Sequence, residues 1–107
     1  MSVGSYIKSQ GSGSMAHGYA SGSSSHIEAG ISAIAHGSTT ESGSYIDAGG
    51  NGADAHGSVS GTNSHISADG AGDVAFGQIE SKNSYISTFL GGGSIAHGYV
   101  IGTNSHI

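Results

Sequence analysis

A short motif returns about every twenty residues along the whole chain of 107 residues. Ser-(Tyr/His)-Ile occurs six times, beginning at Ser5, Ser25, Ser44, Ser64, Ser84 and Ser105. Five copies of Ala-(His/Phe)-Gly lie between these, beginning at Ala16, Ala35, Ala55, Ala75 and Ala96. A fixed period of this length is typical of arrays in which each unit buries its apolar face only by stacking on its neighbours. We therefore predict a single repeat domain over residues 1–107.

One unit, residues 64–83, contains two strands and two turns by its pattern. Residues 64–68 and 73–79 alternate in polarity as strands do, and residues 69–72 and 80–83 are rich in turn-forming residues. The chain has 21 glycines, and this density together with the period of two excludes helix. The sequence predicts an all-β, repetitive β-solenoid, either a flattened β-roll or a triple β-helix. It would have about five twenty-residue coils with two short strands each.

Charged residues indicate which side of each strand faces the core. In the first strand, the side opposite the recurring Ile carries residues such as Glu28 and Asp47, which a dry interior excludes. In the second strand, Asp54 lies opposite the Ala and Gly positions, so we expect Ala and Gly to point inward. The reverse arrangement, with Ile34 and Ile95 inside, is the alternative.

Two outward columns follow from this assignment. A contiguous apolar stripe on a polar surface usually marks an interface. The oligomer-interface candidates on the second strand are Met15, His17, Ile34, His36, His56, Val74, Phe76, Ile95 and His97. A ladder of rings that we expect to stack at the spacing of the coils lies on the first strand, at Tyr6, His26, Tyr45, His65, Tyr85 and His106.

Composition limits the partners and the stability of such a fold. Large apolar side chains are few, so the core is thin and assembly with other copies is expected. Two Lys/Arg against seven Asp/Glu give a net charge of −5, so nucleic acid is not an expected partner. No apolar run is long enough to insert into a membrane, and no signal-peptide pattern is present.

Several segments resemble a known group of repeats. Ser94-Ile95-Ala96-His97-Gly98, Ala33-Ile34-Ala35-His36-Gly37, and Gly-Thr-Asn-Ser-His-Ile at 61–66 and 102–107 are similar to left-handed β-roll repeats. Such repeats occur in the heads of trimeric autotransporter adhesins and, as Ser-His-Ala-Glu-Gly-type repeats, in phage tail-fibre shafts. The chain departs from adhesin heads in its longer period and in placing His where those heads carry an aliphatic residue.

This resemblance implies a function as well as a fold. It implies a parallel homotrimer that serves as a structural or adhesive segment of a phage tail fibre or spike, or of a bacterial surface adhesin. It also implies an extracellular location on a virion tail or cell surface. The main partner would be the same chain, and a host-surface glycan or receptor is a further candidate.

The pattern does not indicate an enzyme, a cofactor or a metal centre. Ser, His and Asp recur as equivalents of one repeat and do not form the singular constellation that catalysis needs. Phe76 interrupts the His column, although three imidazoles around a trimer axis would be able to bind an ion. The stretch 49–54 matches the opening of a calcium-binding nonapeptide, but the chain has no second copy nine residues away. Phe89 and Leu90 occur where other repeats have a glycine-rich turn, so we expect them to form an enlarged turn or an inter-chain plug.

Two other functions fit a solenoid. The first is a self-assembling filament, because the first and last repeats carry no charged cap against end-to-end stacking. The second is ice binding, which uses a flat and regular array, usually of threonine. The threonines here lie at 39, 40, 62, 88 and 103, in no single column.

Overall fold

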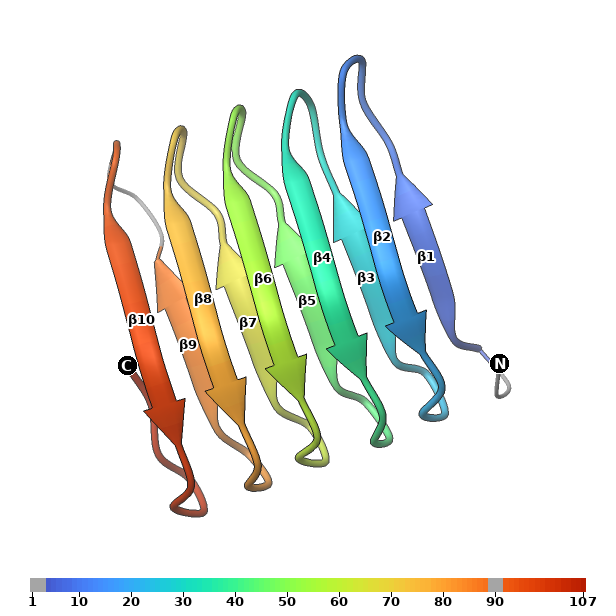
Figure 1. The fold of residues 1–107 in the computed structure, drawn as a ribbon, viewed down its shortest axis with the longest axis vertical. Coiled ribbons are helices and arrows are strands. Elements are labelled where there is room, and N and C mark those ends of the chain that lie inside the picture. The colour runs from blue at the N-terminus through green and yellow to red at the C-terminus, as the bar shows by residue number, and fades with distance from the viewer. Residues whose placement is uncertain (1–3, 89–91) are drawn as a thin grey trace.

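A computed structural model describes residues 4–88 and 92–107, which form a two-layered β-solenoid without helices (Figure 1). Sheet A contains β1 (Tyr6–Ser9), β3 (His26–Ala29), β5 (Tyr45–Ala48), β7 (His65–Ala68) and β9 (Tyr85–Thr88). Sheet B contains β2 (Met15–Ala20), β4 (Ile34–Thr39), β6 (Asp54–Val59), β8 (Val74–Ile79) and β10 (Ile95–Val100). All described strand pairs are parallel and join neighbouring coils. The predicted all-β solenoid of about five coils is confirmed.

Equivalent residues of the motifs align across the strands. Ile27 pairs with Ile46 in sheet A, and Ala35 pairs with Ala55 in sheet B. After the last full coil, His106 forms an isolated parallel bridge with Tyr85, which repeats the same register. Because the register is strict, equivalent side chains of all coils lie on the same face of the sheet. A slip of one residue would move them to the opposite face.

The variation in repeat length falls in one of the two turns. The spacing from the start of a sheet B strand to the start of the next sheet A strand is the same in every coil, as from Ile34 to Tyr45. The spacing from sheet A to sheet B varies, and is shortest from His26 to Ile34 and longest from Tyr85 to Ile95. The turn after a sheet A strand therefore absorbs insertions and deletions. Phe89 and Leu90, expected to form an enlarged turn or a plug, lie outside the described residues.

The core is a single layer between the two sheets. Sheet A contributes fully buried isoleucines at positions 27, 46, 66 and 86, and sheet B contributes buried alanines at 35, 55 and 75. The predicted inward faces of both strands are therefore confirmed. The reverse arrangement is wrong, because the side chains of Ile34 and Ile95 are 42% and 71% exposed. The charged side chains on β3 and β5 point outward, which leaves the isoleucines as the inner face.

Close approach of backbones explains the glycine of the Ala-(His/Phe)-Gly motif. Gly57 has a φ of 144°, and a Cβ placed on it would lie 2.0 Å from the carbonyl oxygen of Gly77 in the next coil. The same approach recurs between Gly37 and Gly57 at 1.9 Å. No side chain fits at this position, so the third residue of the motif is glycine for a steric reason.

Buried serines hold the turn that precedes each sheet A strand. The Ser64 hydroxyl donates to the carbonyl of Ser81 at 2.6 Å and accepts from the backbone N–H of Ser84 at 2.9 Å. Asn63 reaches the left-handed region with a φ of 56°, which asparagine tolerates better than most residues. Ser64 thus ties its turn to the backbone of the next coil, whereas Ser25 and Ser44 donate to carbonyls within their own turns.

Candidate interaction surfaces

The described residues enclose no pocket, so a site on this part of the chain is a surface. They also contain no group of three or more His, Asp or Glu side chains arranged to hold a metal ion. Each sheet turns one side to the core and leaves the other outward. The two outward faces are therefore the candidate sites.

The sheet A face carries the Tyr/His ladder, defined as Tyr6, His26, Tyr45, His65, Tyr85 and His106. All six rings stack in one continuous column, as the sequence predicts. Neighbouring ring centroids are 4.6 to 5.1 Å apart, and the ring planes differ by 1° to 10°. This spacing matches the distance between paired strands, so the sheet itself sets the stacking.

Stacking changes what the ladder can contact. Because each ring covers the faces of its neighbours, the ladder presents ring edges, with phenol hydroxyls and imidazole nitrogens, to the outside. Burial in the column lowers the pKa of His26 and of His65. The negative charges of Glu28, near His26, and of Asp69, near His65, offset this shift in part. Burial also raises the pKa of Tyr45, with Asp47 and Asp69 adding to the effect. The interior of the ladder therefore favours neutral rings.

An acidic group lies beside the ladder on the same face. Glu28 and Asp47 are register partners in β3 and β5, and the carboxylate of Asp69 lies in the turn after β7. Burial raises the pKa of Asp47 to about 6, with smaller contributions from the charges of Glu28 and Asp69. The Asp69 carboxylate accepts a hydrogen bond from the Ser67 hydroxyl at 2.9 Å. Sheet A thus presents an outer face that is polar and negatively charged.

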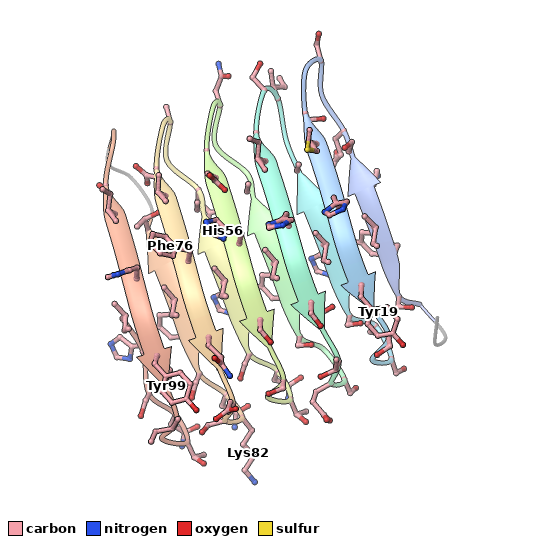
Figure 2. The ribbon with its side chains drawn as sticks, in the orientation of Figure 1. Tyr19, His56, Phe76, Lys82 and Tyr99 are labelled. Carbon is pink, nitrogen blue, oxygen red and sulfur yellow. The ribbon has the colours of Figure 1, made fainter. Side chains whose placement is uncertain are left out.

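The sheet B face carries the residues predicted as interface candidates. We call the nine residues Met15, His17, Ile34, His36, His56, Val74, Phe76, Ile95 and His97 the sheet B stripe. The structure brings all nine to one face, where none of them is fully buried (Figure 2). Met15 is 57% exposed, beside Ile34 on the next strand. Whether the stripe contacts another chain stays a prediction.

Rings of the sheet B stripe stack less regularly than the ladder. His17 and His36 are parallel at 5.3 Å, and His56 and Phe76 are parallel at 5.0 Å. His36 and His56 are tilted by 54° at 5.7 Å, and Phe76 and His97 by 60° at 4.6 Å. These tilted pairs break the column into segments. The surface is consequently less uniform than that of sheet A.

Two tyrosines extend the sheet B face beyond the predicted candidates. Tyr19 and Tyr99 are exposed and lie at the register position two residues after the motif histidine (Figure 2). The Tyr99 hydroxyl donates to the carboxylate of Glu80, and this contact raises the pKa of Tyr99. Every second residue of a strand points to the same side, so this alternation would have added both tyrosines to the predicted interface candidates.

The threonines bear on ice binding, and Asp54 bears on how apolar the sheet B face is. Thr39 and Thr88 point into the core and are buried, so neither contributes to an outward threonine array. Asp54 takes the place of Ile34 and Val74 in the sheet B face, and no described residue donates a hydrogen bond to its Oδ1 atom. The apolar column thus has one charged member.

No family model, curated protein or solved structure matches the chain significantly. Among the described residues, no helix has the length and apolar character needed to cross a membrane. The two outward faces and their chemistry are therefore the basis for inferring a function.

Proposed function

We propose that this chain is a structural segment of a homotrimeric fibre, in which the sheet B stripe packs against the other copies. The fibre would belong to a phage tail or spike, or to a bacterial surface adhesin, as the repeat resemblance implies. It would act outside the cell, as a stiff spacer or an adhesive rod. The observation that carries the proposal is the exposure of large apolar side chains along one flat face.

The size of this face suits a stable interface. The molecule measures 29 × 27 Å across the sheets and 16 Å through them (Figure 1). The area of one face is therefore close to the roughly 800 Å² that a protein buries in a stable pairwise interface, and in a trimer two neighbouring copies would share it. A copy that covers the sheet B stripe would also remove apolar surface from water and supplement a core that is only one layer thick.

Sheet A is the less suitable of the two faces for this contact. Its ladder presents ring edges, and the carboxylates of Glu28, Asp47 and Asp69 lie beside it. Burying these charges against an identical face would be costly, because three carboxylates of each copy would lose water with Lys8 as the cation in register beside Glu28. Sheet A would therefore remain on the outside of the fibre.

A charge placed on the sheet B stripe tests the proposal. We expect His56→Asp to abolish the assembly, because it adds a second carboxylate next to Asp54 on the face that becomes buried. Ser87→Asp is the matched control, since it adds the same charge on the outward side of β9. Size-exclusion chromatography at neutral pH is the measurement. A His56→Asp variant that elutes at the wild-type volume would contradict the proposed interface.

A further inference from the structure

We propose that acid releases this assembly through the histidines of the sheet B stripe. The inference rests on the proposed function, since it concerns the regulation of that same interface. Four of the seven histidines of the chain, His17, His36, His56 and His97, lie on the sheet B stripe. Imidazole is the side chain whose charge ordinarily changes between pH 5 and 8.

The spacing of these rings places like charges close together once the imidazoles are protonated. His17, His36 and His56 occupy three consecutive strands, with ring centroids separated by 5.3 and 5.7 Å. In the separate chain, His17, His36 and His97 are exposed to water. In the assembly they would be desolvated and close to the same residues of other copies. Protonation therefore favours the separated chains.

Phe76 shows that the fold does not require imidazole at this position. It occupies the register position of His56 and His97 and stacks parallel on His56 at 5.0 Å. An apolar ring thus satisfies the same packing within the sheet. Compared with phenylalanine, histidine adds ring nitrogens that form hydrogen bonds and gain a proton.

Few opposing charges face the four histidines. On the sheet B face, Asp54 is the carboxylate within the strands, and it lies in the apolar column between Ile34 and Val74. Glu80 follows β8 and accepts a hydrogen bond from Tyr99, whereas Lys82 extends from the turn beyond the end of β8 (Figure 2). With Glu41 in the turn after β4, three carboxylates are thus available against up to four histidine charges and Lys82 in each chain. Protonation would leave an excess of positive charge on the interface.

The experiment measures the dissociation constant of the assembly at pH 7.5 and pH 5.0 by analytical ultracentrifugation, with circular dichroism confirming that the fold persists. For the wild-type chain we expect the dissociation constant to rise at least about 100-fold at pH 5.0, because the separated chains would bind more protons than the assembly does. In the quadruple variant His17→Phe, His36→Phe, His56→Phe and His97→Phe, we expect a change below about threefold. A quadruple His→Gln variant checks that added hydrophobicity does not cause this result.

The matched control changes histidines of the other face. His26→Tyr and His65→Tyr use the alternative residue of the ladder, and we expect this variant to dissociate at pH 5.0 as the wild type does. A wild-type chain that stays assembled at both pH values would overturn the acid switch while leaving the proposed assembly intact. A chain that is monomeric at pH 7.5 would overturn the proposed function itself. Equal pH dependence in the wild type and both quadruple variants would also overturn the switch.

Discussion

The glycine of the Ala-(His/Phe)-Gly motif shows how one residue constrains the whole stack. At Gly57 the carbonyl oxygen of Gly77 occupies the space of a Cβ, and the backbone adopts a φ of 144°. Both features disfavour any other residue. Gly52 differs, because its φ of 74° is strained for a side chain but no described atom lies within 4 Å of a Cβ there. A side chain at Gly57 would meet both steric overlap and backbone strain, whereas one at Gly52 would meet backbone strain alone.

We expect Gly57→Ala to destabilise the fold by more than about 4 kcal/mol, since the strands of two coils would have to separate. Gly52→Ala should cost only about 1 kcal/mol, the usual cost of a left-handed backbone for alanine. Urea denaturation followed by circular dichroism measures both values. Equal losses at the two positions would show that the close approach of Gly57 and Gly77 is not decisive.

Asp47 predicts how stability depends on pH. Its pKa of about 6 in the folded chain is above the ordinary value of 3.8, so the folded chain binds this proton more tightly than the unfolded chain does. This carboxylate therefore destabilises the fold above pH 6, and the penalty disappears as the pH falls toward 4. Asp47→Asn should stabilise the chain by about 1 kcal/mol at pH 8, allowing for solvent screening. It should have little effect at pH 4. Urea denaturation at both values tests this, and a loss of stability at pH 8 would contradict it.

At the scale of elements, the two turns of a coil have different tolerances. The turn before each sheet A strand keeps a constant length in every coil, and both backbone and serine hydroxyl groups bond it to the next coil. The backbone N–H of Asn63 donates to the carbonyl of Ser42 at 3.0 Å, and Ser64 bonds to both Ser81 and Ser84. The opposite turn varies in length between coils while the register of the strands stays unchanged.

One glycine inserted in each turn tests this difference. Inserted after Asn51, in the variable turn, it should cost less than about 1 kcal/mol, because lengthening a short loop costs little entropy. Inserted after Thr62, in the constant turn, it should cost more than about 2 kcal/mol through lost hydrogen bonds to buried groups. Urea denaturation again provides the values. Similar costs for the two insertions would contradict the assignment of a fixed and a variable turn.

Much of each coil was predictable from the sequence because the motif repeats in register. The strand predicted at 73–79 is β8, Val74–Ile79, and the charge of Asp54 correctly indicated the outward side of sheet B. The backbone reason for the glycine was not predictable, because contacts between coils depend on coordinates. The alternation also put Tyr19 and Tyr99 on the outward side, although they were not among the interface candidates; their register position holds Ser38, Ser58 and Gln78 in other coils. The role of the sheet B stripe depends on a partner, which one chain does not contain.

At the scale of the whole molecule, the chain is a plate with two dissimilar faces. Its shortest dimension is 16 Å, so the apolar layer has one side chain from each sheet across its thickness. Sheet A is ordered by the Tyr/His ladder and carries carboxylates, whereas sheet B exposes apolar side chains. This asymmetry is the basis for assigning sheet B to contacts between copies and sheet A to the outside.

The most direct test of that assignment is the absolute mass in solution, measured by light scattering across a dilution series at pH 7.5. The chain has a mass of 10.4 kDa, and we predict a species of three times this mass that persists on dilution. A constant mass equal to that of one chain would contradict the account, because the sheet B stripe would then remain exposed to water. A mass that rises steadily with concentration would contradict the closed trimer and indicate open-ended polymerisation instead.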